Sequence, residues 1–179
     1  MPDDKYLGKY RNSTFRAQWH NYDGGFYFVT ICTKDRMHYF GEIEHDENGN
    51  PIMNLSQIGK IAQECWMAIP QHFPHIKTPL WVVMPDHIHG IVIINDIVRS
   101  QNFAPPQHKN KYGPQSKNLA SAIRGFKIGV TKYARENNIP FQWQRLFHDH
   151  IIRDSNEMNH IAEYIENNVA KWEFDKNHK

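Results

Sequence analysis

Two apolar, β-branched runs separated by a Pro-Asp dipeptide constrain the fold of this chain more than any other feature. The first run spans residues 80–84 and the second spans 88–94, with Pro85 and Asp86 between them. Strand-like runs joined by so short a turn signal are typical of a β-hairpin. The sequence therefore predicts an antiparallel pair of strands, and the two histidines of the segment 87–89 fall on its second arm.

The rest of the chain alternates between strand-like and helix-like patterns. Aromatic and β-branched residues predict a first, central strand, and apolar residues at helical spacing predict the helices. Capping residues are expected at Asn54 or Ser56, at Ser116 or Asn118, and at Asp154, the last in a capping box with Glu157. The expected elements are strand 26–33, helix 55–69 ending before Pro70, strands 80–84 and 88–94, helix 119–137, strand 141–152, and a last helix through Asn168 or beyond.

This order, β-α-β-β-α-β-α, predicts an α+β fold. It resembles the split βαβ arrangement of ferredoxin-like and RRM-like domains, an antiparallel sheet with two helices on one face. One C-terminal helix is left over, and it carries Tyr164. The polar, proline-containing segment 95–116 has no periodicity and is expected to be a flexible loop.

Length and composition indicate one globular domain over residues 1–179. The chain has 179 residues, of which 40% are hydrophobic, enough for a sizeable core. No apolar stretch approaches the ~20 residues that span a bilayer, and the N-terminus lacks a signal peptide, so we expect a cytoplasmic, nucleoid-associated protein and no membrane partner. Cys32 and Cys65 have neither disulfide nor zinc spacing.

The charge of the chain is unevenly distributed. The formal net charge is +2, but residues 108–153 hold nine Lys or Arg and two acids, net +7, which leaves −5 for the remainder. A basic region of this kind favours a polyanionic partner, although charge runs are more often solvated surface. Charge alone therefore permits nucleic-acid binding without establishing it.

His87 and His89 form a His-x-His pair on the predicted strand. Alternate side chains of a strand share a face, so the two imidazoles project together, about 6.6 Å apart along the strand, while Ile88 faces the core. Such a pair suits joint ligation of one metal ion. Twelve histidines in this length give roughly 0.8 such pairs by chance, and a second pair stands at positions 148 and 150. The apolar residue between them favours His87 and His89, but spacing alone leaves a structural role open.

Tyr164 and Asn168 lie four residues apart on the expected C-terminal helix. Side chains at this spacing leave one helix face, and the Asn168 amide oxygen is a hard third ligand for an ion beside two histidines. Tyrosines of terminal amphipathic helices are mostly core residues, however, and Tyr133 is a competing candidate. The residues alone therefore leave the role of Tyr164 open.

Eight segments spread along the chain form one larger pattern. They are residues 26–33, 40–43, 68–74, 82–90, 123–127, 143–145, 150–153 and 164–168. Together they make the chain resemble the HUH single-tyrosine transposases, particularly the REP-associated group, over nearly its whole length. Three departures from the pattern are Asp86 where Asn is usual, Phe147-His148 in place of an aromatic pair, and Val169 in place of a frequent proline.

The resemblance implies an enzyme that cleaves and rejoins single-stranded, hairpin-containing DNA through a 5′-phosphotyrosine intermediate. It implies Tyr164 as nucleophile, with His87, His89 and Asn168 holding Mg²⁺ or Mn²⁺. Glu163 and Glu166 are candidate proton acceptors. The expected DNA contacts are Arg124, Lys127, Lys132, Arg135, Arg145 and Arg153. The sequence does not decide between a monomer and a homodimer.

Two other functions remain compatible with the sequence. An RRM-like module without catalytic activity has the same sheet topology and stacks bases on exposed aromatics, for which Tyr27 or Phe28 could serve. A domesticated transposase would keep the chemistry and serve a host role. The histidine pair and the absence of an RNP-like strand argue against the first, and sequence does not separate the second from a mobile transposase.

Overall fold

A four-stranded antiparallel sheet organises the chain in the computed structural model, which describes residues 24–95 and 118–176. Its strands are β1 (Gly25–Cys32), β4 (Ile76–Met84), β5 (His87–Ile94) and β6 (His148–Ile151), in the order β4-β5-β1-β6. Each neighbouring pair is antiparallel. This is the strand order of the split βαβ, ferredoxin-like fold, so the expected α+β class, the β4–β5 hairpin and the central first strand are confirmed.

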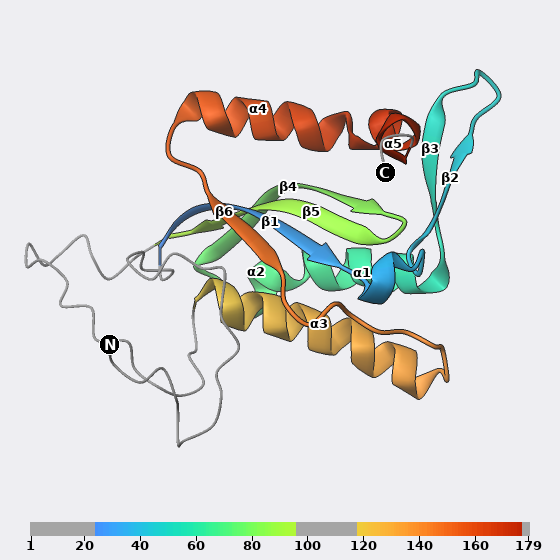
Figure 1. Ribbon diagram of the computed structural model, residues 1–179. Coiled ribbons are helices and arrows are strands. Elements are labelled where there is room, and N and C mark those ends of the chain that lie inside the picture. Colours follow the sequence, from blue (N-terminus) through green and yellow to red (C-terminus); the bar gives the residue numbers. More distant parts are fainter. Residues whose placement is uncertain (1–23, 96–117, 177–179) are drawn as a thin grey trace, which may run out of the picture.

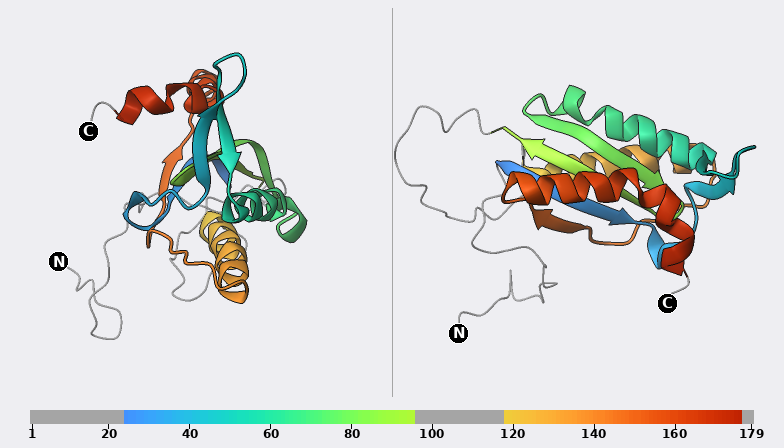
Figure 2. Two further views of the ribbon diagram at one scale, coloured as in Figure 1. Left: turned by 90° about the vertical axis from the view of Figure 1, so that its right-hand side faces the viewer. Right: turned by 90° about the horizontal axis from the view of Figure 1, so that it is seen from above.

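Helices cover both faces of the sheet. They are α1 (Gln57–Met67), α2 (Ile69–His72), α3 (Leu119–Glu136), α4 (Ser155–Glu166) and α5 (Asn168–Lys176). Figures 1 and 2 show α1 to α3 on one face and α4 on the other. Ser56, Asn118 and Asp154 cap α1, α3 and α4 through their side chains, each accepting from the backbone N–H three residues on. Within the described ranges, no helix has the length and apolar character of a membrane span.

Alternation along the strands produces two cores of unequal size. Tyr27, Val29 and Ile31 of β1 are fully buried on the face toward α1 and α3, where they join the larger core. The alternate residues of β1 point to the other face, toward α4. On that face Ile91 of β5 packs with Ile165 of α4 in a smaller core. The smaller core under α4 therefore leaves room on that face for polar groups, which the larger core under α1 and α3 does not.

Gly90 lies where the larger core meets the middle of β5. A Cβ atom there would come within 2.3 Å of the Trp66 indole of α1, closer than any side chain tolerates. Trp66 is fully buried and packs edge-on against Phe126 of α3 at 5.4 Å between ring centroids. The absence of a side chain at Gly90 thus lets α1 approach the sheet directly behind the histidine pair.

The prediction of a strand over residues 141–152 is wrong for residues 141–147. Only His148–Ile151 forms a strand, and before it Trp143 makes an isolated bridge with Thr33. The Trp143 ring packs into the core and its Nε1 donates to Lys127 O at 3.1 Å. The Lys127 ammonium in turn donates to Gln144 O and Leu146 O at 2.8 and 3.2 Å. A side chain therefore occupies carbonyl groups that a longer strand would use in its ladder.

Other boundaries also differ from the sequence-based expectation. A hairpin of β2 (Gly41–His45) and β3 (Pro51–Leu55) was not predicted, because its side chains are mostly exposed and show no strong apolar alternation. The helix expected over 55–69 ends at Met67, and Pro70 lies in the first turn of α2. The C-terminal helix is interrupted at Asn167, which caps α4 before α5 begins. All but the first residue of the expected loop 95–116 lies outside the described residues.

Candidate active site

His87 and His89 lie side by side on β5, facing α4. Both are almost fully buried, with 5% and 6% exposure, and their ring centroids are 4.4 Å apart. Ile88 between them is fully buried in the larger core on the other face. The strand alternation expected from the sequence thus brings the two imidazoles together.

Tyr164 reaches this pair from the opposite side of the smaller core. Its hydroxyl lies 3.3 Å from Nε2 of His89, although 75 residues separate the two in sequence. Phe28 of β1 stacks on His89 and meets the Tyr164 ring edge-on, at centroid distances of 5.1 and 6.0 Å. The tyrosine remains 40% exposed. A partly exposed tyrosine whose hydroxyl lies beside the histidine pair can therefore meet a substrate.

Hydrogen bonds orient each imidazole through Nδ1. Asp86 Oδ1 contacts Nδ1 of His87 at 2.5 Å, and a carboxylate only accepts, so Nδ1 carries the proton of a neutral His87. Thr30 Oγ1 lies 2.8 Å from Nδ1 of His89. If Nδ1 of His89 donates to Thr30, Nε2 accepts from the Tyr164 hydroxyl, and both ring nitrogens of His89 then have a partner. In this arrangement Nε2 is the nitrogen without a proton in both rings, and that of His89 faces Tyr164 of α4.

Burial keeps His89 neutral. Desolvation, reinforced by the charges of His87 and Arg36, lowers the pKa of His89 from 6.5 to about 3. A neutral imidazole is the form that binds metal ions. His89 is therefore ready to act as a ligand at neutral pH and is a poor proton acceptor.

Asp86 stays ionised despite being buried. Burial alone would raise its pKa, but the hydrogen bond with His87 and the charges of His87, Arg36 and His38 outweigh this and hold the pKa below its ordinary value. The Arg36 Nε lies 2.8 Å from Oδ2 of the same carboxylate. The negative charge behind His87 is therefore a permanent feature of the site.

Asn168 is the first residue of α5 and is 5% exposed. Trp172, four residues further on, lies 5.8 Å from the His87 ring, so Asn168 stands on the helix face that turns toward the pair. Within the described ranges no three His, Cys, Asp or Glu side chains cluster as a metal site. A cation beside the pair would meet two imidazoles, and Asn168 on this helix face offers an amide oxygen as a harder donor.

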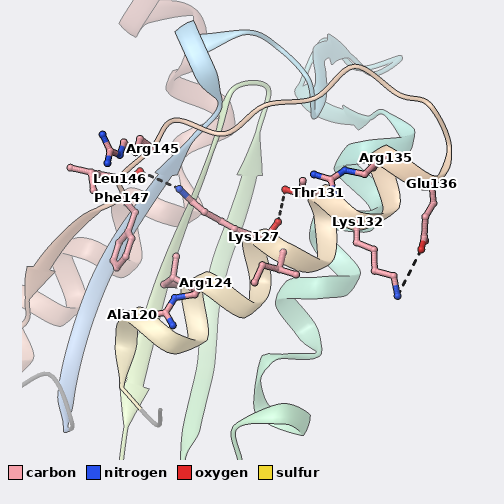
Figure 3. Close-up of a pocket in the computed structure, with 12 residues that line it drawn as sticks. Ala120, Arg124, Lys127, Thr131, Lys132, Arg135, Glu136, Arg145, Leu146 and Phe147 are labelled. Carbon is pink, nitrogen blue, oxygen red and sulfur yellow. Dashed lines mark hydrogen bonds and ion pairs between the residues drawn. The ribbon is translucent and has the colours of Figure 1, made fainter. Parts of the chain in front are cut away.

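Five of the six expected DNA contacts gather elsewhere, around a groove of about 740 Å³ on α3 (Figure 3). They are Arg124, Lys127, Lys132, Arg135 and Arg145. Ile128 and Leu146 in the same groove are 59% and 40% exposed. Since α3 and α4 cover opposite faces of the sheet (Figure 1), the groove and Tyr164 are on opposite sides of the molecule. Arg153 does not line the groove and precedes the cap of α4.

The groove cations differ in their freedom to bind a ligand. Burial lowers the pKa of Lys127 to about 8, and its ammonium is held by two backbone carbonyls and lies 5.4 Å from the Trp143 ring. Lys132 is 3.8 Å from Glu136. Among the described residues, Arg124 and Arg135 have no carboxylate within ion-pairing distance. Lys127 therefore stabilises the fold, while the two arginines are available to a ligand.

The structure also bears on residues whose roles the sequence left undecided, and on residues that the sequence did not indicate. His150 of the second pair contacts Glu157 of α4, which supports a structural role. In the described chain, the polar atom near the Tyr164 hydroxyl is Nε2 of His89 and not a carboxylate of Glu163 or Glu166. Thr30, Arg36 and Trp172 were missed, because only the strand register and the α4–α5 break bring them to the histidines.

The aromatic residues proposed for base stacking in an RRM-like module do not form an open platform. Tyr27 is fully buried toward α1 and α3, and its hydroxyl donates to Gly24 O. Phe28 lies under α4 between His89 and Tyr164. The sheet face that would stack bases is thus covered by a helix.

Comparison with known proteins finds relatives of this chain in Haemophilus influenzae. No family model matches it. It is 38% identical over 174 residues, 94% of both chains, to a Haemophilus influenzae protein named "Uncharacterized protein". It is 26% identical over 148 residues, 83% of this chain and 72% of the other, to a protein of the same organism named "Putative REP-associated tyrosine transposase".

The fold gives the same relationship. A solved structure of a REP-associated tyrosine transposase bound to a REP hairpin superposes with a TM-score of 0.57 at 19% identity, covering 89% of this chain and 74% of that one. The sequence match and the shared fold agree with the resemblance drawn from the eight segments. The chain is thus similar in sequence to one REP-associated tyrosine transposase and shares the fold of another.

Proposed function

We propose that this chain cleaves and rejoins single-stranded DNA, with Tyr164 as nucleophile beside a divalent cation held by His87, His89 and Asn168. The observation that carries the proposal is the 3.3 Å contact between the Tyr164 hydroxyl and Nε2 of His89. Two segments far apart in sequence thus bring a tyrosine hydroxyl next to a buried pair of imidazoles, which supports the assignment. Core packing alone requires no such juxtaposition.

The Tyr164 oxygen attacks the scissile phosphorus. A bond forms between the tyrosine oxygen and phosphorus while the bond to the 3′-oxygen breaks, so a 5′-phosphotyrosine and a free 3′-hydroxyl result. Attack of a 3′-hydroxyl on the phosphotyrosine reverses the step and reseals a strand. The energy of the phosphodiester is conserved in the covalent intermediate, and no nucleotide cofactor is consumed.

The histidine pair orients the reacting groups. When bound, a divalent cation would supply electrostatic stabilisation of the charge that builds up on the phosphate oxygens. His87 and His89 are held for this purpose by Asp86 and Thr30 through their Nδ1 atoms. Such outer hydrogen bonds fix the ring orientation and tautomer of metal-binding histidines.

The tyrosine proton leaves toward solvent. His89 has a pKa of about 3 and accepts a proton poorly, and no carboxylate of α4 contacts the hydroxyl among the described residues. Tyr164 as a whole is 40% exposed, so water is the remaining acceptor in this proposal. We therefore expect the cleavage rate to increase with pH through the neutral range without a histidine inflection.

We infer that the α3 groove binds the DNA away from the scissile phosphate. Arg124 and Arg135, which have no carboxylate partner among the described residues, suit phosphate contacts, and the exposed apolar side chains of the groove suit sugar or base surfaces. The related transposase of known structure is bound to a REP hairpin. A hairpin-containing strand is therefore the proposed substrate, with the groove contacting one part and Tyr164 another.

A covalent-adduct assay tests the proposal. The purified chain is incubated with 5′- and 3′-labelled hairpin DNA and Mg²⁺ or Mn²⁺, and the denatured products are separated. The expected result is a protein adduct on the 3′-labelled fragment, joined through its new 5′-phosphate, which Tyr164→Phe abolishes and His87→Ala weakens, while Tyr133→Phe leaves it unchanged. An adduct that persists in Tyr164→Phe contradicts the assignment of the nucleophile.

A further inference from the structure

Asp86 occupies the two-residue turn between β4 and β5 and has both carboxylate oxygens engaged. The residue is 4% exposed. Its Oδ1 contacts Nδ1 of His87 and its Oδ2 lies 2.8 Å from Nε of Arg36. A buried carboxylate is tolerated when it is paired and hydrogen-bonded, and this one joins a positive charge to a histidine of the site.

The segment carrying Arg36 is fixed against the same turn. Thr33 donates its N–H to Asp86 O at 2.9 Å, and its hydroxyl lies within hydrogen-bonding distance of that oxygen and of Met37 O. On the other side of the segment, Phe40 donates its N–H to Pro85 O at 3.0 Å. Arg36 is therefore carried by a short loop whose two ends are both bonded to the turn beside His87.

The backbone of this loop adopts an unfavourable conformation. Asp35 and Arg36 have φ angles of 53° and 56°, in the left-handed region that non-glycine residues rarely enter. Two such residues in succession cost free energy that the surrounding structure must offset. In this conformation the Arg36 guanidinium reaches the Asp86 carboxylate in the turn.

A second contact fixes the plane of the guanidinium. Arg36 Nη1 donates to Sγ of Cys32 at 2.9 Å while Nε faces Asp86. Cys32 is the cross-strand neighbour of His87 in the β1–β5 pairing. Arg36 thus contacts Cys32 at the end of β1 and Asp86 in the turn before β5, the strand that carries His87.

We propose that Arg36 is a positioning residue that acts through Asp86 to hold the His87 ring in the orientation and tautomer that present Nε2 to the cation. The inference rests on the proposed function, because the cation site is part of that proposal. Arg36 itself does not contact the substrate phosphate in this role. It keeps the Asp86 carboxylate turned toward Nδ1 of His87, which requires that nitrogen to carry the proton.

The pairing has a chemical consequence that separates it from general stabilisation. Asparagine at position 86 could still accept from His87 through its oxygen, but its NH₂ group would then face the Arg36 guanidinium, and two donors would oppose each other. Without the guanidinium that conflict disappears. Arg36 and Asp86 are therefore expected to act as a matched pair, each change costing less once the other has been made.

NMR of the metal-free protein tests the positioning directly. With ¹⁵N-labelled histidine at constant neutral pH, we expect one Nδ1–H tautomer for His87 in the wild type and mixed tautomers in Arg36→Met. Arg36→Lys, which keeps the charge, should restore part of the wild-type signal. Lys60→Met, a matched change on exposed α1, should leave it unaltered. A single unchanged tautomer in Arg36→Met overturns the inference.

Mn²⁺ titration without DNA links the positioning to the cation. Arg36→Met and Asp86→Asn should each weaken Mn²⁺ affinity by about tenfold, and the double variant should also lose about tenfold in place of a hundredfold. Losses that multiply, or no loss in Arg36→Met, contradict the inference. Circular dichroism of each variant identifies any that fail to fold. If Asp86→Asn fails to fold, the double variant with Arg36→Met should fold, and a double variant that also fails contradicts the inference.

The two experiments separate this inference from the proposed function. A wild-type chain that shows the single His87 tautomer but binds no Mn²⁺ contradicts the cation site of the proposed function and leaves the effect of Arg36 on His87 standing. A chain that binds Mn²⁺ equally well in wild type and Arg36→Met overturns the positioning role and leaves the cation site intact.

Discussion

The two faces of the central sheet organise polar groups in opposite ways. Under α4, His87, His89 and Asp86 are buried, and each is held by a specific hydrogen bond. On the outer side of α3, the groove displays arginines such as Arg124 and Arg135 at the surface, without carboxylate partners in the described chain. One face therefore fixes a few groups in orientation, whereas the other presents charge.

The difference suits a division between chemistry and binding. Transition-state stabilisation depends on groups whose orientation is set in advance, so buried and bonded side chains are effective there. Phosphate contacts that position DNA depend on accessible charge and are sensitive to salt. Changes under α4 should thus affect the rate of cleavage, and changes in the α3 groove should affect affinity.

Tyr164→Phe should have the largest effect and the most selective one. Loss of the nucleophilic oxygen should lower the single-turnover cleavage rate by about 10³-fold or more. The ring and its contacts with Phe28 remain, so hairpin affinity, measured by fluorescence anisotropy, should change by less than about twofold. A variant that loses affinity in parallel with rate would break the proposed division between the faces.

Gly90→Ala tests the packing that separates the faces. The added Cβ would lie 2.3 Å from the Trp66 ring, so α1 or β5 must move, and we expect a loss of about 1–3 kcal/mol in the free energy of unfolding. Gly125→Ala on α3 is the matched control, because its Cβ would meet Phe73 at an ordinary 3.6 Å. That change should stabilise the helix by up to about 1 kcal/mol. Urea denaturation of both variants measures the contrast.

Sequence reasoning succeeded where one short segment determines the outcome. The alternation of His87, Ile88 and His89 on a strand follows from residue spacing, and the hairpin turn follows from Pro85 and Asp86. The caps of α1, α3 and α4 are also local signals. These predictions needed no knowledge of how distant segments pack.

Features that depend on distant packing were not predictable in this way. The contact of Arg36 with Asp86 requires two left-handed residues and a loop bonded to a turn 50 residues away, and no local pattern indicates it. The segment before His148 does not continue the strand, and two of its backbone carbonyls accept hydrogen bonds from Lys127 of α3. The opposite placement of Tyr164 and the basic residues appears only when the helices are assigned to faces of the sheet.

The stability of the metal-free protein should report the burial of His89. Its pKa is about 3 in the folded chain and 6.5 ordinarily, so between these values the unfolded chain binds more protons. This contribution is complete above pH 6.5 and is lost as pH falls toward 3, by about 1.4 kcal/mol per pH unit. His89→Gln should show a shallower decrease in urea-unfolding free energy between pH 6 and 5. Equal slopes for the two proteins would contradict a buried, neutral His89.

Arg124→Ala combined with Arg135→Ala should have the smallest and most salt-dependent effect. Because both arginines face the groove without ion-pair partners among the described residues, their loss should weaken hairpin affinity by about tenfold at low salt. The slope of log affinity against log salt concentration should become shallower by about 2, one for each phosphate contact removed. The single-turnover rate at saturating DNA should stay unchanged, since neither side chain lies on the face of Tyr164. A reduced rate at saturation would show that the groove and the tyrosine are coupled, and the two faces would then have to be treated as one site.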